Sequence, residues 1–507
     1  MNPQSGGIVL AMVMMLGALF TARRSEGREQ VLPLIPRPVE VRRDSGEYLL
    51  ANGASLRVSS VSRDVAELLQ ADLHQRTGLQ LEIQVTADLV GMTMAISAGS
   101  FPKLENAWPA PRPEAYTLRI APAGVFLAGA DRAGLYWATR TLLQLLERQG
   151  EQWVLPAVTV RDYPRFPRRG LLLDPARNFI SLPGLKRQVD LISRLKLNVL
   201  HLHLTDDQGW RFESKAFPKL QEIGGQGKFY TQAELRELVA YAAARGVTVM
   251  PEIDMPGHTT ALLAAYPELS CSGEKLEVSH HVGIHPNALC PAKEEVYDFL
   301  QTLLAEVAAV FPSEYIHIGS DEVVAKDWDR CPACEKLLAE KKLTGKKGLH
   351  SYFLERVNAI ITGLGRKTLA WDEVTDFAPE GVTVQVWHKK NWVTVAVEQG
   401  REVISTPNLY TYLDHPRWML PLWLCYRLDP VPAEVPPPRV KQIKGGGANL
   451  WGEFAPEAKL DQKLFPRLPA LAEVYWSPQE DRRYLDFRRR LGKLQPELEA
   501  QGVKFGR

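Results

Sequence analysis

A strand-then-helix pattern repeats eight times after residue 160 of this 507-residue chain. Each repeat opens with a short apolar run, and an amphipathic stretch follows most of these runs. Eight units of this kind in roughly 310 residues predict an α/β fold, a closed (β/α)8 TIM barrel. A doubly wound open sheet is the alternative, but its Gly-rich phosphate loop is missing. The expected strands are residues 170–173, 199–204, 247–253, 315–318, 368–371, 382–387, 402–405 and 447–451.

A smaller domain is expected before the barrel. Residues 31–160 mix short strand-like runs with two amphipathic helical stretches, at 62–77 and 131–148, and therefore predict an α+β domain. A proline-punctuated segment at 162–168 marks the junction. We accordingly assign residues 161–507 to the barrel.

The first 30 residues carry an uncharged apolar run, 6–22, followed by Arg23 and Arg24. This pattern is typical of an export signal, or of an N-terminal membrane anchor. We expect an exported protein, either periplasmic or extracellular. With 61 basic and 59 acidic side chains the net charge is only +2, so nothing favours nucleic acid or an anionic membrane surface as partner.

Charged and aromatic residues follow almost every expected strand. In a (β/α)8 barrel these positions share one rim, where active sites are built. So many carboxylates in one place repel each other, and this repulsion lowers the stability of the fold. A functional role explains their presence better than a purely structural one. The residues are Asp174, Arg177, Asp206, Asp207, Trp210, Arg211, Glu252, Asp254, His258, Asp321, Glu322, Trp371, Asp372, Glu373, Trp387, His388, Tyr410, Tyr412, Asp414, Trp451 and Glu453.

The adjacent pair Asp321 and Glu322 suits general acid/base chemistry, with one neutral acid beside one ionised neighbour. Tryptophans at three strand ends suit the apolar face of a sugar ring. Together they favour cleavage of glycosides. Consecutive strand residues point to opposite faces, so both carboxylates can face one substrate only if the strand ends at Asp321 and the backbone turns there.

A metal-dependent hydrolase is the competing enzyme class. His201 and His203 form an H-x-H pair that shares one strand face, and His258, Asp321 and His388 could add ligands. No further tight histidine cluster follows in the sequence. We therefore expect no metal and no cofactor in the site.

The cysteines give a weak signal. Cys331 and Cys334 form a single C-x-x-C, which lacks the second pair that zinc sites of this type need, so a local disulfide or two thiols is the favoured interpretation. Cys271 and Cys290 bracket a polar loop that a disulfide could staple, and Cys425 is left over.

Seven motifs in order carry a family resemblance. The chain resembles the family 20 glycoside hydrolases, the β-N-acetylhexosaminidases, over nearly all of its length after the N-terminal segment. The motifs are Arg169-Gly-Leu-Leu-Leu-Asp-Pro-Ala-Arg177, His203-Leu-Thr-Asp-Asp-Gln-Gly-Trp-Arg211, Pro251-Glu-Ile-Asp-Met-Pro-Gly-His258, His317-Ile-Gly-Ser-Asp-Glu322, Trp371-Asp-Glu373, Tyr412-Leu-Asp414 and Trp451-Gly-Glu453.

The resemblance implies exo-acting, retaining hydrolysis of terminal β-linked N-acetylhexosamine, in which the substrate's own 2-acetamido oxygen attacks the anomeric carbon and an oxazolinium intermediate forms. Glu322 would be the general acid and base. Asp321 would bind the acetamido N–H, and Tyr412 the acetamido oxygen. The partners would be oligosaccharides or glycoconjugates that contain N-acetylhexosamine.

The resemblance also implies roles for the remaining site residues. Three tryptophans would wall the acetamido pocket, three polar residues would bind sugar hydroxyls, and Asp206 with His258 would form a supporting pair behind Glu322. The tryptophans are Trp371, Trp387 and Trp451, and the polar residues are Arg169, Asp414 and Glu453.

The sequence departs from the family pattern at two positions. Ser320 stands where the family usually has glycine, and Asn178 where histidine is common. Ser320 is the one hint at a further alternative, a glycan-binding barrel that has lost catalysis.

Overall fold

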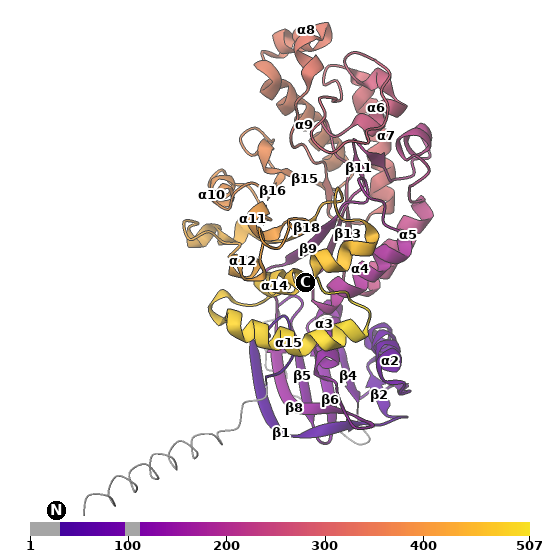
Figure 1. Cartoon of the computed structure of the whole chain (residues 1–507), viewed down its shortest axis with the longest axis vertical. Helices are drawn as coiled ribbons and strands as arrows, with labels where there is room; N and C mark the ends of the chain where they lie inside the picture. The colour runs from indigo at the N-terminus through magenta and orange to yellow at the C-terminus, as the bar shows by residue number, and fades with distance from the viewer. Residues whose placement is uncertain (1–30, 97–111, 507) are drawn as a thin grey trace, which may run out of the picture.

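A computed structural model describes residues 31–96 and 112–506. Within these residues it places a small domain at one end of a closed barrel (Figure 1). The apolar run at 6–22 lies outside the described residues, so export stays a prediction. In the described part of the chain, no helix combines the length and apolarity that a membrane span requires.

The small domain is one mostly antiparallel sheet, with the strand order β1-β8-β5-β6-β4-β2-β3 and β7 paired to β8. Two helices accompany it, α2 (Arg63–Thr77) and α3 (Arg132–Leu145). This confirms the expected α+β domain. The strands are β1 (Glu40–Leu50), β2 (Ser55–Val58), β3 (Glu82–Val85), β4 (Thr93–Ile96), β5 (Tyr116–Ala121), β6 (Gly124–Gly129), β7 (Glu147–Gln149) and β8 (Gln152–Asp162).

Strand β8 was not expected from the sequence, although it is 11 residues long. Pro156 interrupts its apolar pattern, and proline has no N–H to give to a ladder. In the sheet Pro156 pairs with Glu47, where the register of β1 shifts between Arg43 and Glu47. The irregularity in β1 therefore accommodates the proline.

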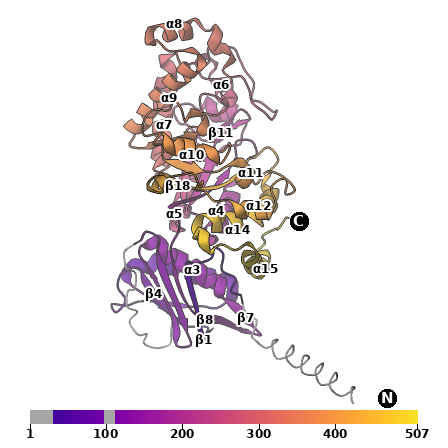
Figure 2. The same ribbon diagram turned by 90° about the vertical axis from the view of Figure 1, so that its left-hand side faces the viewer.

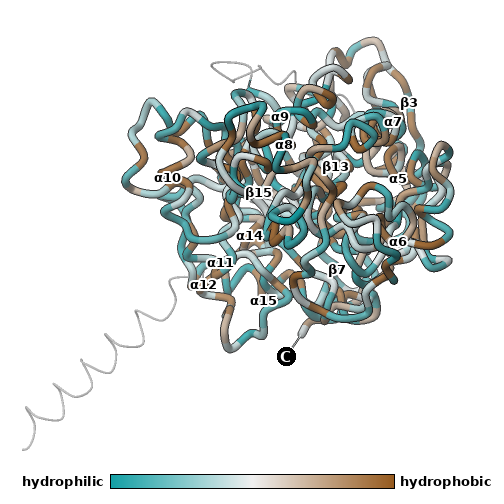
Figure 3. Tube along the Cα trace, turned by 90° about the horizontal axis from the view of Figure 1, so that it is seen from above, coloured by the Kyte–Doolittle hydropathy of each residue, from teal (hydrophilic) through white to brown (hydrophobic). Residues whose placement is uncertain are grey.

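Eight parallel strands close into the barrel, in the order β10-β13-β14-β15-β16-β17-β18-β9. All eight overlap the expected runs, which confirms the fold. Seen from above, β13 and β15 lie within a ring that includes α5, α7, α9 and α10 (Figure 3). The strands are β9 (Arg168–Leu173), β10 (Val199–His203), β13 (Thr248–Glu252), β14 (Tyr315–His317), β15 (Lys367–Trp371), β16 (Thr383–Val386), β17 (Val403–Ser405) and β18 (Ile443–Leu450).

Helices cover the outside of the barrel. After the last strand the chain adds α14, which packs on β18 and β9, and α15, which crosses the junction between the two domains (Figure 1). The helices are α4 (Leu182–Arg194), α5 (Gln232–Ala244), α6 (Thr260–Ala265), α7 (Glu294–Val310), α8 (Pro332–Lys341), α9 (Gly345–Gly363), α10 (Asn391–Glu398), α11 (Asn408–Thr411), α12 (Leu422–Arg427), α13 (Leu460–Leu464), α14 (Arg467–Trp476) and α15 (Tyr484–Ala500).

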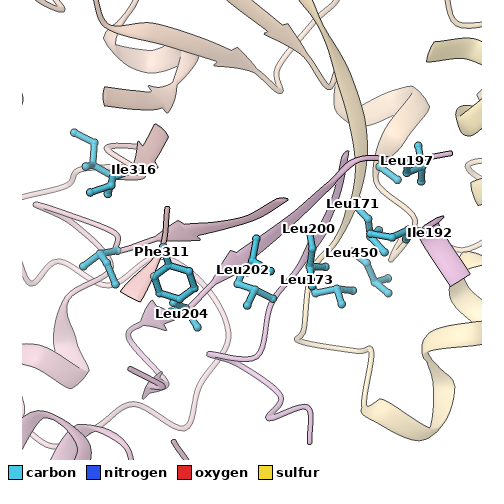
Figure 4. Packing of buried hydrophobic residues seen from close by; sticks show 14 of the residues in the cluster. Leu171, Leu173, Ile192, Leu197, Leu200, Leu202, Leu204, Phe311, Ile316 and Leu450 are labelled. Carbon is cyan, nitrogen blue, oxygen red and sulfur yellow. The ribbon is translucent and has the colours of Figure 1, made fainter. Parts of the chain in front are cut away.

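Alternate residues of strand β10 face the hydrophobic core outside the barrel and the barrel interior. Leu200 and Leu202 are fully buried in the hydrophobic core that surrounds the barrel, with Leu171 and Leu173 of the neighbouring β9 (Figure 4). Side chains alternate along a strand, so His201 and His203 point the other way, into the barrel. The leucines hold the strand in place while the histidines remain available inside it.

The small domain closes the end of the barrel where the strands begin. Helix α3 lies between its sheet and the barrel (Figure 2). Tyr136 of α3 donates its hydroxyl to Ser193 Oγ at 3.2 Å, at the end of α4, and Arg132 donates to the Ala244 carbonyl at 2.8 Å, at the end of α5. Both partners precede a barrel strand, so the opposite rim is left open.

Two buried cations join the domains. Lys196 Nζ lies 3.0 Å from Asp162 Oδ2, and Trp476 Nε1 donates to the same carboxylate at 2.9 Å. Arg169, which is 0% exposed, pairs with Glu114 through Nη2 and Oε2 at 2.5 Å. Removing one partner of a buried ion pair leaves the other charge buried without a counter-charge.

We expect Arg169→Ala to lower the free energy of unfolding by about 3 kcal/mol, because it leaves the Glu114 carboxylate without its cation at the domain junction. Urea or thermal unfolding measures the loss. The matched control is Arg161→Ala, whose exposed pair with Glu40 spans 3.6 Å and contributes less than about 1 kcal/mol. Equal losses in both variants would contradict the prediction.

Candidate active site

A pocket of about 410 Å³ opens at the rim where the barrel strands end. This is the rim where (β/α)8 barrels build their sites, and the volume falls in the usual range of small-molecule sites. It brings together every residue assigned to the site from the sequence except Arg169. Its lining is Arg177, His203, Asp206, Asp254, His258, Asp321, Glu322, Trp371, Trp387, Tyr412, Asp414, His415, Pro416, Trp451, Glu453 and Phe454.

The backbone after β14 makes the turn that the two carboxylates require. Strand β14 ends at His317, and Gly319, Ser320 and Glu322 then adopt φ values of 60°, 71° and 49°. Three left-handed residues in four reverse the alternation of a strand. Asp321 and Glu322 therefore both line the pocket.

Gly319 is held against Asp254, the residue that follows β13 by two positions. A Cβ at Gly319 would lie 1.8 Å from Asp254 Oδ1, and its φ favours glycine as well. The next N–H, of Ser320, donates to the same oxygen at 3.2 Å. Asp254 thus fixes the backbone just before Asp321.

Ser320 fits without displacing this backbone. Its side chain is fully buried, and Ser320 Oγ lies 2.8 Å from His350 Nε2 of helix α9. Burial lowers the pKa of His350 to about 4, so the imidazole is neutral and can share a hydrogen bond with the hydroxyl. The serine that departs from the family pattern is therefore accommodated by a partner of its own.

A cationic histidine lies behind the two carboxylates. His258 Nε2 is 3.5 Å from Glu322 Oε2 and 3.7 Å from Asp321 Oδ2, while its Nδ1 is 3.3 Å from Asp206 Oδ1. Burial by itself would lower the pKa of His258, but Asp206 and Asp321 outweigh it and hold the pKa well above its usual value. The structure thus brings Asp206 and His258 together behind Glu322, as the resemblance implies.

Asp321 is the deeper of the two carboxylates. Its side chain is 14% exposed, against 33% for Glu322. Burial raises the pKa of Asp321, the cation of His258 opposes that shift, and the buried charge of Glu252 adds to it. Asp321 therefore suits a partner that brings positive charge, and Glu322 lies nearer to the mouth.

Four aromatic rings line the pocket together with the two carboxylates. Tyr412 is near-parallel to Trp387, with ring centres 6.1 Å apart, and lies 6.1 Å from Trp451. Trp451 in turn lies 5.8 Å from Trp371. Trp387 is fixed by Glu373, whose two oxygens both lie 3.1 Å from its indole Nε1.

Asp414 and Glu453 line the same pocket. Burial raises the pKa of both carboxyl groups. Arg177 Nε lies 3.4 Å from Glu453 Oε1, and Arg177 Nη2 lies 2.7 Å from Asp206 Oδ2. One guanidinium therefore links a sugar-binding candidate to the pair behind Glu322.

The prediction that Arg169 binds substrate is wrong. Arg169 is the second residue of β9 and sits where the barrel strands begin, bonded to Glu114 and to the carbonyls of Lys196 and Phe166. Arg177, the last residue of the same motif, lies in the pocket instead. The sequence already held this signal, because Arg169 lies at the start of its strand whereas rim residues follow the ends of theirs.

His201 and His203, the H-x-H pair of the metal-dependent alternative, lie inside the barrel together with His317, which was not among the proposed ligands. His201 Nε2 and His203 Nδ1 each lie 2.9 Å from Glu252 Oε2, and His317 Nδ1 accepts the N–H of Gly319 at 3.0 Å. His388 lies apart from them, with Nδ1 3.0 Å from Asp372 Oδ1. His203 lies within 4.8 Å of Asp206 and Asp254 through its ligand atoms, and His258 lies as close to Asp254 and Asp321.

Comparison with known proteins agrees with the geometry. The profile "Glycosyl hydrolase family 20, catalytic domain" matches residues 166–479, and "Glycosyl hydrolase family 20, domain 2" matches residues 31–163. A β-hexosaminidase of Porphyromonas gingivalis is 32% identical over 93% of this chain, which spans 64% of that relative's length. A β-hexosaminidase of Akkermansia muciniphila is 35% identical over 82% of this chain and 87% of its own.

A solved structure has the same architecture. It is the exo-β-N-acetylglucosaminidase of Vibrio harveyi in complex with N-acetylglucosamine, at a TM-score of 0.83 and 30% identity. The match covers 94% of this chain and 78% of the Vibrio chain.

Substitutions of the two residues before Asp321 are expected to affect kcat very differently. Gly319→Ala forces the backbone away from Asp254 and should lower kcat on a chromogenic N-acetylglucosaminide by about 100-fold, since a shift near 1 Å can cost that much. Ser320→Gly accepts the same backbone angle and should keep kcat within a few-fold. A large loss in Ser320→Gly, with Gly319→Ala unaffected, would overturn this account of the turn.

Proposed function

The chain belongs to glycosyl hydrolase family 20, the β-N-acetylhexosaminidases, and we propose that its pocket releases terminal β-linked N-acetylhexosamine by substrate-assisted catalysis. The carrying observation is that the turn after β14 presents both Asp321 and Glu322 to one pocket walled by tryptophan and tyrosine. The structure of the Vibrio relative in complex with N-acetylglucosamine supports this choice of sugar. The natural partners are oligosaccharides and glycoconjugates that end in this sugar.

Glu322 supplies the proton. It is the more exposed carboxyl group and lies at the mouth, where a leaving group departs. As the bond between the anomeric carbon and the glycosidic oxygen breaks, Glu322 donates its proton to that oxygen. In the second half of the reaction the Glu322 carboxylate takes a proton from water, which adds to the same carbon and restores the starting acid.

Asp321 steers the nucleophile that the substrate brings. The acetamido oxygen attacks the anomeric carbon and closes a five-membered oxazolinium ring, so positive charge develops on the acetamido nitrogen. The deep carboxylate of Asp321 accepts the N–H and stabilises that charge in a site with little water. Two inversions at the anomeric carbon then give retention.

The aromatic wall positions the acetamido group. Tyr412 is 7% exposed, and its hydroxyl donates to the acetamido oxygen, which aligns that oxygen for attack. The indoles of Trp371, Trp387 and Trp451 enclose the acetamido methyl group and exclude water. Holding an internal nucleophile in place can lower the activation free energy by about 7 kcal/mol.

The polar groups of the pocket bind the ring hydroxyls. Asp414 and Glu453 accept hydrogen bonds from them, and Arg177 holds Glu453 in place.

A glycan-binding barrel without catalysis is the alternative function. Ser320 was its one hint in the sequence, and the hydrogen bond between Ser320 and His350 removes that hint. Turnover measurements separate the two functions, since the alternative predicts binding of sugar without release of product.

The acetamido group is expected to be required. The enzyme should cleave a chromogenic β-N-acetylglucosaminide and leave the matching β-glucoside essentially intact, because the glucoside has no internal nucleophile. Asp321→Asn should lower kcat on the acetamido substrate by about 10²–10³-fold, since it removes the charge that stabilises the intermediate. Similar rates on the two substrates would exclude the mechanism.

Loss of the proton donor should depend on the leaving group. Glu322→Gln is expected to lower kcat/KM by about 10²–10⁴-fold on a chitobiose-like disaccharide, whose leaving alcohol needs protonation. Activated aryl glycosides, whose leaving groups depart as anions, should suffer much less in the first half-reaction. A burst of aryl alcohol followed by slow turnover is the signature, and equal losses on both substrate types would contradict the assignment.

A further inference from the structure

Four of the five cysteines converge at the end of the barrel that carries the pocket. Cys271 follows the turn η3 (Pro267–Leu269), Cys290 precedes α7, and Cys331 and Cys334 begin α8. Their four sulfur atoms all lie within 4.8 Å of one another. This corrects the pairwise interpretation of the sequence, in which Cys271 with Cys290 and Cys331 with Cys334 were separate pairs.

The sulfur separations match a tetrahedron around one ion. Cys334 Sγ lies 3.7 Å from Cys271 Sγ and 3.8 Å from Cys290 Sγ. Zinc–thiolate bonds of about 2.3 Å in tetrahedral geometry place neighbouring sulfurs about 3.8 Å apart. A disulfide would bring two sulfurs to about 2.05 Å of each other. The sulfur of Cys334 is instead nearly equidistant from those of Cys271 and Cys290.

The surroundings suit a closed, structural site. Cys290 and Cys334 are fully buried and Cys331 nearly so, among Ala288, Trp328, Leu337 and Leu349. Cys271 is partly buried. Four sulfur ligands in such surroundings leave no open position for a substrate, as in structural zinc sites with four cysteines.

Nearby positive charge offsets the thiolates. Cys331 caps helix α8 and Cys334 lies in its first turn, so both sulfurs sit at the positive end of the helix. Lys293 Nζ donates to the carbonyls of Ser270, next to Cys271, and of Glu268, at 2.6 Å and 2.7 Å. The ion itself supplies two further positive charges.

We propose that Cys271, Cys290, Cys331 and Cys334 bind one structural zinc ion. On binding, each thiol releases its proton to solvent and forms a sulfur–zinc bond, and no atom is oxidised or reduced. The ion takes no part in the hydrolysis proposed above, so the two proposals can fail separately.

The site would anchor the loop that carries the catalytic carboxylates. Eight residues separate Glu322 from Cys331. Between them Trp328 Nε1 donates to the Leu289 carbonyl at 3.0 Å, beside Cys290, and the Trp328 ring meets His350 at 6.4 Å between centres. His350 in turn holds Ser320. One ion thereby ties the loop after β14 to the loop after β13.

Metal content of the full chain tests the proposal directly. The protein is purified without a polyhistidine tag, dialysed in metal-free buffer and measured by inductively coupled plasma mass spectrometry. We expect about one zinc per chain, as a single site of four cysteines requires. Cys334→Ser should lose the zinc, several degrees of thermal midpoint and a measurable part of kcat. Cys425→Ala is the matched control, because Cys425 is a buried cysteine outside the cluster, and it should keep the zinc.

Thiol chemistry on the wild-type protein keeps the test decisive if Cys334→Ser does not fold. A mercurial titrant should release the zinc to a colorimetric chelator as the cluster thiols react, and cobalt exchanged into the site should give the visible and thiolate charge-transfer bands of tetrahedral sulfur coordination. Iron in place of zinc, a protein without metal, or a mass showing two or four hydrogens fewer through disulfides would each overturn the proposal.

Discussion

The carboxylate of Glu252, buried at the centre of the barrel, is the charge on which the pocket depends. Burial would raise its pKa, but the surrounding histidines hold that pKa well below the usual value. A buried charge costs several kcal/mol unless its partners are fixed. Here Trp371 Nε1 donates to it at 3.0 Å and His203 Nδ1 lies at 2.9 Å. The wall of the acetamido pocket and the first link toward the catalytic pair are therefore set by one anion.

From Glu252 a chain of alternating charges reaches the catalytic carboxyl. Glu252 and Asp206 both act on His203 and raise its pKa well above the usual value against the effect of burial, and His203 Nε2 lies 2.7 Å from Asp206 Oδ2. Asp206 then contacts His258, which lies 3.5 Å from Glu322. Each group in this chain contacts the next, so the side chain of Glu322 is positioned by contacts that begin in the barrel core. It therefore needs little reorganisation when substrate binds.

The sequence predicted the barrel well, because eight short apolar runs that each end in charged or aromatic residues fit few other folds. It predicted most members of the pocket for the same reason, but not His415, Pro416 or Phe454, which lie in loops beyond the strand ends. It did not predict strand β8, where Pro156 breaks the pattern. The assignment of Arg169 to the site rested on the resemblance of a whole motif, whereas the direction of β9 places Arg177 at the rim. The meeting of the four cysteines also escaped it, because 18 residues separate Cys271 from Cys290 and 40 separate Cys290 from Cys331, and only the closed barrel brings their loops together.

The small domain occupies the end of the barrel where the strands begin, and the described chain starts there too: Arg490 donates to the Leu34 carbonyl at 2.6 Å. The pocket opens at the other end. A chain immobilised through residues before Val31, on a resin or by fusion to another protein, would present its pocket to the solution rather than to the support. Long glycan chains, which would not enter a narrow space between the protein and the support, could then still reach the pocket with their terminal sugar.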